Sequence, residues 1–182
     1  MSSKGISVVI PNYNGSNLLA AILPCLYTAL ENSKEIYEVI ISDDCSTDES
    51  ISFLENNFPA VLLIKNVVNQ GFSPTINKGI FAAKYDYVLL LNSDVKLTPN
   101  YFESVLRYFD KEDTFGVMGR IVGWEDDKIQ DAAKYPSFHG AKIKTSGNYY
   151  AATPATDDWL YSMYLSGANA LIDRKKLVEL GG

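Results

Sequence analysis

Short apolar runs alternate with helical patterns over the first 110 residues, and this alternation constrains the fold more than any other feature. The runs expected to form buried strands are residues 6–10, 39–41, 61–64 and 87–91. Each is followed by a stretch whose apolar residues recur at the spacing of one helix face. Strands separated by helices form βαβ units with right-handed crossovers and a largely parallel sheet. We therefore predict an α/β fold with a mostly parallel sheet between helices, because continuously apolar strands are covered on both faces.

Local signals mark where the helices should begin, and one proline should disturb a helix. Ser46–Glu49 reads as a capping box, while Ser73-Pro74 and Thr98-Pro99 each place a proline directly after a capping hydroxyl. Pro24 lies inside the first helical pattern, where it removes a backbone donor. We expect it to kink or split that helix.

The pattern weakens in the second half of the chain. Residues 116–123 are a candidate further strand, and residues 125–127 are expected to form a solvated turn rather than a metal cluster. Asp173 is expected to cap a last helix over residues 174–180. His139, the only histidine, is expected at the surface.

Composition and charge exclude several classes of protein. The 182 residues are 47% hydrophobic and contain no repeat or linker, so we treat 1–182 as one domain. A net charge of −6 without a Lys/Arg run argues against a nucleic-acid binder. Cys25 and Cys45 have no metal-ligand spacing and are expected to stay reduced. Since no signal peptide is visible and residues 87–91 are too short to span a bilayer, we expect a cytoplasmic chain, working in solution or at the inner face of the membrane.

Candidate binding residues follow the predicted strands, because ligands of open parallel sheets bind outside the carboxyl ends of the strands. The polar segments at these ends are residues 11–15, 42–46, 66–71 and 92–94. A carboxylate after the second strand can accept hydrogen bonds from a base N–H or from ribose hydroxyls. We favour this role for Asp44, whereas Asp43 is as suited to capping the helix near Ser46.

Asp94 comes directly after the fourth strand and is the candidate metal ligand. A carboxylate there can hold a hard cation through oxygen, and the cation can bridge a diphosphate. An acidic chain that handles an anionic nucleotide needs such a local counter-charge.

Taken in order, the motifs of the chain resemble those of the GT-A glycosyltransferases of family two, most closely the rhamnosyltransferase-like branch. They are Val8-Val9-Ile10-Pro11-Asn12-Tyr13-Asn14, Ile41-Ser42-Asp43-Asp44-Cys45-Ser46-Thr47-Asp48, Asn69-Gln70-Gly71-Phe72-Ser73 with Asn77-Lys78-Gly79, Leu89-Leu90-Leu91-Asn92-Ser93-Asp94, Ser166-Gly167-Ala168-Asn169-Ala170-Leu171-Ile172-Asp173-Arg174 and Leu180-Gly181-Gly182. The resemblance covers almost the whole chain and is weakest over residues 123–161. It implies a Rossmann-like GT-A fold.

The resemblance also implies a nucleotide-sugar site, with a UDP- or dTDP-sugar as the expected donor. The residues it assigns to the nucleotide are Pro11, Tyr13, Asp43, Asp44, Asn69, Gly71, Asn92 and Ser93. Tyr13 would stack on the base and Asp44 would bind it, with Asp43 next to the ribose. Asp94 would ligate Mg²⁺ or Mn²⁺ on the diphosphate. The family's metal motif is Asp-x-Asp, and its first position here is Asn92, so fewer protein charges would hold the ion.

The implied reaction is an inverting transfer of a hexosyl or deoxyhexosyl group to a saccharide or a lipid-linked saccharide, as in the assembly of bacterial surface polysaccharides. The family places its base in a Glu-Asp pair shortly after a Gly-Gly like Gly181-Gly182. We therefore expect a truncated piece of a longer enzyme, with the base beyond Gly182. Asp157-Asp158 is the nearby acidic pair that could substitute, although a turn or a contact to the donor sugar suits it better. Trp159 is a weaker candidate for stacking on a sugar.

Three other functions compete with this reading. A nucleotidyltransferase would need a glycine-rich basic loop after the first strand, whereas residues 11–15 contain one glycine and no Lys or Arg. A phospho-acceptor receiver domain would place its acid pair after the first strand rather than the second. A non-catalytic sugar-nucleotide-binding module remains an open alternative.

Overall fold

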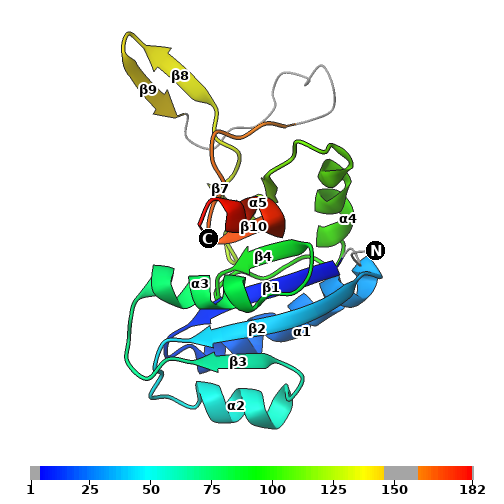
Figure 1. Ribbon diagram of the computed structural model, residues 1–182, viewed down its shortest axis with the longest axis vertical. Coiled ribbons are helices and arrows are strands. Elements are labelled where there is room, and N and C mark those ends of the chain that lie inside the picture. The colour runs from blue at the N-terminus through cyan, green and yellow to red at the C-terminus, as the bar shows by residue number, and fades with distance from the viewer. Residues whose placement is uncertain (1–4, 146–159, 182) are drawn as a thin grey trace.

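The computed structural model describes residues 5–145 and 160–181 and has a six-stranded sheet as its centre (Figure 1). The strand order is β3-β2-β1-β4-β10-β5. These strands are β1 (Gly5–Asn12), β2 (Ile36–Asp43), β3 (Leu62–Lys65), β4 (Tyr87–Leu91), β5 (Gly116–Met118) and β10 (Asn169–Asp173). β1 to β4 are parallel, while β10 runs antiparallel to both β4 and β5. The predicted mostly parallel sheet is confirmed, and its strand order reverses between β1 and β4.

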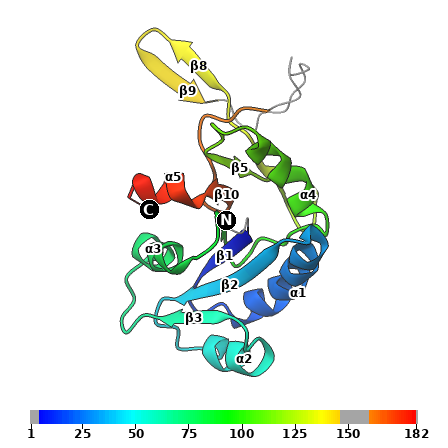
Figure 2. The ribbon, with the colours of Figure 1, turned by 45° about the vertical axis from the view of Figure 1, so that its right-hand side comes forward.

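Helices cover both faces of the sheet. They are α1 (Ser16–Ser33), α2 (Ser50–Asn57), α3 (Phe72–Ala82), α4 (Tyr101–Leu106), the 3-10 helix η1 (Arg107–Asp110) and α5 (Arg174–Glu179). Val8 belongs to the core formed with α1 and α4, whereas its neighbour Val9 belongs to the core formed with α3 and α5. Figure 2 shows α1 and α3 on opposite sides of β1 and β2. Both valines are fully buried, which explains why the strand is continuously apolar.

Two hairpins lie outside the main sheet. The first pairs β6 (Ile121–Val122) with β7 (Ile129–Asp131), and the exposed turn between them contains residues 125–127, as predicted. The second pairs β8 (Pro136–His139) with β9 (Lys142–Thr145) and projects away from the body of the domain (Figure 1). The single strand expected over residues 116–123 is therefore wrong, because β5 and β6 belong to different sheets.

Pro24 does not split α1, which runs unbroken from Ser16 to Ser33. The proline cannot donate to the carbonyl of Ala20. Both residues are exposed, so water can bind that carbonyl in place of the missing N–H.

The capping box expected at Ser46–Glu49 is wrong, since α2 begins at Ser50 and has no side-chain cap at Glu49. Asp48 instead accepts hydrogen bonds from the backbone N–H of Ser16 and of Ser50, each at 3.0 Å. A contact distant in the chain, to the start of α1, thus decides where this helix begins.

The other two expected helix starts are also displaced. α3 begins at Phe72, which places Pro74 within the first turn, where a missing N–H breaks no intrahelical bond. α4 begins at Tyr101, after a turn in which its N–H donates to the Thr98 carbonyl. The cap at Asp173 is confirmed, because its side chain accepts from the N–H of Lys176.

Gly79 lets α3 lie directly against the sheet. A Cβ at this position would overlap Val9 Cγ1 and lie 2.8 Å from Ser42 Oγ. We expect Gly79→Ala to lower the free energy of unfolding by about 1–3 kcal/mol through overpacking. On an exposed helix position the same change would instead stabilise by about 1 kcal/mol.

Urea unfolding of Gly79→Ala and of the exposed control Ala82→Gly measures both contributions. The control is expected to lose only the propensity difference of about 1 kcal/mol. A Gly79→Ala protein more stable than the wild type would contradict the close packing described here.

Candidate functional site

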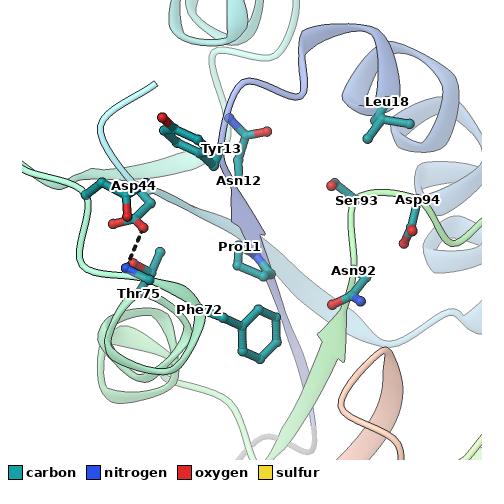
Figure 3. Close-up of a pocket in the computed structure, with 12 residues that line it drawn as sticks. Pro11, Asn12, Tyr13, Leu18, Asp44, Phe72, Thr75, Asn92, Ser93 and Asp94 are labelled. Carbon is teal, nitrogen blue, oxygen red and sulfur yellow. Dashed lines mark hydrogen bonds between the residues drawn. The ribbon is translucent and has the colours of Figure 1, made fainter. Parts of the chain in front are cut away.

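A pocket of about 330 Å³ opens at the carboxyl ends of β1 and β4, where the strand order reverses. The residues that line it are Pro11, Asn12, Tyr13, Leu18, Asp44, Asn69, Gly71, Phe72, Thr75, Asn92, Ser93 and Asp94. Every residue that the sequence assigned to the nucleotide or the metal is among them, except Asp43. Figure 3 shows Asp44 and Thr75 on one side of the pocket and Asn92, Ser93 and Asp94 on the other, with Pro11 and Phe72 between them.

Asp44 is held by a ring of donors at the inner side of the pocket. Its Oδ1 accepts from Asn66 Nδ2 and from the Gln70 N–H, and its Oδ2 accepts from the Gly71 N–H, each at 2.8 Å. The Thr75 side chain is a further hydrogen-bond partner of the carboxylate. Burial raises the pKa of Asp44, but these hydrogen bonds outweigh it and lower the pKa to about 2. The carboxylate is therefore ionised at neutral pH, and a ligand N–H would compete only with the rotatable hydroxyl of Thr75.

Asn66 fixes the orientation of Asp44; the sequence placed it in the candidate segment 66–71 but gave it no role of its own. This buried amide donates to Asp44 Oδ1 and to Thr75 Oγ1, both at 2.8 Å, and its own oxygen accepts from Lys78 Nζ at 2.6 Å. Asn66 therefore connects the end of β3 both to α3, through Thr75 and Lys78, and to Asp44. Its only sequence signal is its position directly after the third apolar run.

Asp43 is buried and is not among the residues that line the pocket. Its Oδ1 accepts from Asn12 Nδ2 at 2.8 Å and from Ser46 Oγ at 2.6 Å, while its Oδ2 accepts from the Ser46 N–H at 2.9 Å. These bonds hold the turn after β2 against the end of β1. Asp43 thus makes the local hydrogen bonds that the sequence offered as one of its two roles, and the ribose contact stays a prediction.

Aromatic and aliphatic side chains form the walls of the pocket. Tyr13 is 57% exposed and Phe72 is 52% exposed, which leaves faces of both rings free for a ligand. Phe72 and Leu18 were missed as pocket residues. Phe72 starts α3 directly after Gly71, whose φ of +85° requires a residue without a side chain, so the glycine next to an aromatic was the available signal.

The outer side of the pocket offers oxygen ligands. Asp94 is exposed, and the buried Oδ1 of Asn92 has no hydrogen-bond partner within the described part of the chain. Carboxylate and amide oxygens suit Mg²⁺ or Mn²⁺, so the residues fit a divalent cation. No three His, Cys, Asp or Glu side chains converge on a metal position within residues 5–145 and 160–181. A cation here would therefore depend on the oxygens of a bound ligand.

Several other expectations concern residues away from the pocket. His139 is exposed on β8, as predicted, and Cys25 and Cys45 are free thiols. Asp157-Asp158 and Trp159 lie outside the described residues. Of the helices in the described ranges, none combines the length and the apolar character needed to cross a membrane.

Comparison with known proteins identifies the family of the chain. The profile described as "Glycosyl transferase family 2" matches residues 7–181. A chondroitin synthase from Escherichia coli is 36% identical over 121 residues, which are 63% of this chain and 17% of that protein. A poly(ribitol-phosphate) beta-glucosyltransferase from Bacillus spizizenii is 34% identical over 125 residues, which are 65% of this chain and 19% of that protein. The chain thus spans less than a fifth of the length of both relatives.

Solved structures share the fold at low sequence identity. A mannosyltransferase from Pyrobaculum calidifontis, in complex with GDP-Man and Mn²⁺, matches with a TM-score of 0.68 and 17% identity, over 97% of this chain and 46% of that one. S. aureus TarS residues 1–349, in complex with UDP-GlcNAc, match with a TM-score of 0.58 and 21% identity, over 67% of this chain and 36% of that one. These likenesses confirm the GT-A fold.

Proposed function

Because the chain belongs to glycosyl transferase family 2, we propose that its pocket binds a nucleotide-diphospho-sugar, with a UDP- or dTDP-sugar as the donor. One observation carries the proposal: an ionised, buried Asp44 and an oxygen-rich Asn92–Asp94 segment face each other across a pocket walled by Tyr13 and Phe72. The Asp44 side suits the nucleotide base, and the Asn92–Asp94 side suits the diphosphate. The donor sugar is proposed to be a hexose or deoxyhexose, in keeping with the rhamnosyltransferase-like motifs.

Each side of the pocket has a separate task in this proposal. Tyr13 and Phe72 offer their ring faces to the base, and Asp44 accepts a hydrogen bond from a base N–H. Asp94 and the unpartnered oxygen of Asn92 hold Mg²⁺ or Mn²⁺ against the donor phosphates. When bound, the cation offsets the charge that develops on the leaving diphosphate. Ser93 and Asn69 complete the polar lining.

The proposed reaction is an inverting transfer to a hydroxyl of a saccharide or a lipid-linked saccharide. The acceptor oxygen attacks the anomeric carbon of the donor sugar, and the nucleoside diphosphate leaves from the opposite face. The acids that line the pocket, Asp44 and Asp94, already have roles on the donor. We therefore place the base that removes the acceptor proton outside the described residues.

The test is a calorimetric titration of UDP, dTDP and GDP into this chain, with Mn²⁺ and with excess chelator. We expect one of the pyrimidine nucleotides to bind with Mn²⁺ and its affinity to fall by about tenfold or more with chelator, since the phosphate charges then lose their counter-ion. Inorganic pyrophosphate serves as the control ligand that lacks a base and is expected to bind more weakly. Absence of binding by every nucleotide in the presence of Mn²⁺ would refute the donor site.

A further inference from the structure

The β8–β9 hairpin presents apolar side chains to solvent at a distance from the pocket. It projects from the body of the domain in both views (Figures 1 and 2). Phe138 pairs with Ile143 across the two strands, and the two side chains are 74% and 55% exposed. Because the two side chains are neighbours across the strands, they form a contiguous apolar patch rather than single exposed residues.

The register gives the hairpin two different faces. Successive residues of a strand point to opposite sides, so Phe138 and Ile143 share one face. The pairs Ser137–Lys144 and His139–Lys142 lie on the other. The lysines thus flank Ile143 in sequence, and their long side chains can reach around the edge of the hairpin toward a charged surface.

The charge of this region is opposite to that of the rest of the chain. No Asp or Glu occurs from residue 132 to residue 156, a run that contains Lys134, Lys142 and Lys144. With histidine neutral, the run carries a formal charge of +3, while the remaining residues carry −9. Lys134 precedes β8 and is paired with Asp131 at 2.8 Å, so the positive charge of the hairpin itself comes from Lys142 and Lys144, next to the exposed apolar pair.

We propose that the β8–β9 hairpin docks on a lipid bilayer that contains anionic lipids. Phe138 and Ile143 lie at the boundary between headgroups and acyl chains, and Lys142 and Lys144 lie near the lipid phosphates. An anionic polysaccharide would use the lysines and the Phe138 ring, but it offers nothing apolar to Ile143. The aliphatic member of the exposed pair therefore favours a bilayer over a polymer.

Docking by this hairpin has a consequence for the acceptor. The residues that line the donor pocket fall between Pro11 and Asp94, so none of them comes from the β8–β9 hairpin, and contact of the hairpin with a bilayer uses none of them. A lipid-linked saccharide presented at the same bilayer would then meet the enzyme at high local concentration. The membrane contact itself does not depend on the donor assignment.

The experiment is co-sedimentation of this chain with vesicles of equal parts phosphatidylcholine and phosphatidylglycerol, and with vesicles of phosphatidylcholine alone. We expect binding to the anionic vesicles that weakens as salt is raised. The double variant Lys142→Gln/Lys144→Gln should lower the partition coefficient about thirtyfold, the equivalent of losing two lysines at the surface. Phe138→Ser/Ile143→Ser should lower it about tenfold through lost apolar burial.

Matched control variants distinguish an effect of the hairpin on vesicle binding from the effect of losing the same charge or apolar surface elsewhere. Lys128→Gln/Lys175→Gln removes the same charge elsewhere, and Ile36→Ser/Phe81→Ser removes a similar exposed apolar pair from the body. Both should bind vesicles as the wild type does, and far-UV circular dichroism should show all variants folded. Equal binding to neutral vesicles would overturn the proposal. The proposal would also be overturned if the control variants bound anionic vesicles as weakly as the hairpin variants do. Retention of the chain on an anionic polysaccharide matrix without binding to vesicles would overturn it too.

Discussion

Asp44→Asn is expected to weaken nucleotide binding by roughly two orders of magnitude. The side chain accepts from Asn66 and from the backbone N–H groups of Gln70 and Gly71. An amide has one acceptor oxygen and one donor nitrogen, so at least one of these donors would face an N–H₂ group in place of an oxygen. The loop after β3 would lose its anchor, and the ligand would lose its charged acceptor. Calorimetry with the nucleotide that the wild type binds best measures the loss.

The same substitution has a pH signature that distinguishes a missing charge from general damage. Hydrogen bonds lower the pKa of Asp44 in the folded protein to about 2, below the ordinary value of 3.8. Its contribution to stability is therefore complete at neutral pH and is lost as the pH falls from its ordinary pKa through about 2. The difference in the free energy of unfolding between wild type and Asp44→Asn should be constant above about pH 5 and shrink below it.

Urea unfolding at a series of pH values follows this difference. Asp127→Asn is the matched control, because Asp127 is exposed and its positive φ of 51° is tolerated by asparagine. It should differ little from the wild type at every pH. A gap between wild type and Asp44→Asn that stays constant down to about pH 2 would rule out a stabilising Asp44 carboxylate.

Asp94→Asn is expected to abolish most of the effect of the divalent cation on nucleotide affinity. Asp94 is the charged oxygen ligand on its side of the pocket, and Asn92 beside it is neutral. With two neutral amides in this segment, the cation would be held almost entirely by the ligand phosphates. We expect the affinity in Mn²⁺ to fall by about ten- to a hundredfold or more, since the loss of even an outer-shell partner of a metal ligand costs that much.

The comparison in chelator makes the Asp94 experiment decisive. Without a cation, Asp94→Asn should bind the nucleotide at least as well as the wild type, since the mutation then removes no ligand of an ion and takes a negative charge away from the phosphates. Asp127→Asn should keep the full response to Mn²⁺. If Asp94→Asn retains the full response to Mn²⁺, the cation is not bound at Asp94, and its site lies elsewhere in the chain.

The sequence was sufficient to predict the layered sheet and the place of the pocket. Val8 and Val9 pack on helices on opposite faces of the sheet. The continuous apolar run that results can be read from the sequence, and it predicts a strand covered on both faces. The carboxyl ends of parallel strands meet at one edge, so Asp44 and Asp94 could be expected to face the same space although they lie 50 residues apart.

The sequence could not distinguish the two acids of the Asp43-Asp44 pair by direction. Asp43 ends β2 and turns toward Asn12, whereas Asp44 turns toward the loop after β3. That choice depends on which donors the neighbouring segments supply. Asn66 received no role within the predicted segment 66–71 for the same reason, because its importance comes from partners on α3 and after β2.

Helix starts were predicted poorly for a related physical reason. Local capping patterns compete with hydrogen bonds from distant segments. At α2 the predicted capping box did not form, because Asp48 accepts a hydrogen bond from the start of α1. Where no distant donor competes for the side chain, as at Asp173, the local rule held.

The antiparallel β10 also determines the order in which the chain can complete its fold. β10 pairs with β4 on one side and β5 on the other, so β5 joins the sheet only through a strand that is made some 50 residues later. Until residues 169–173 have left the ribosome, β4 is an open edge of the sheet, and its own residues include the apolar Leu89 and Leu91. A nascent chain of this protein therefore forms the strands of its pocket early, but the edge of β4 stays unpaired until β10 has been made.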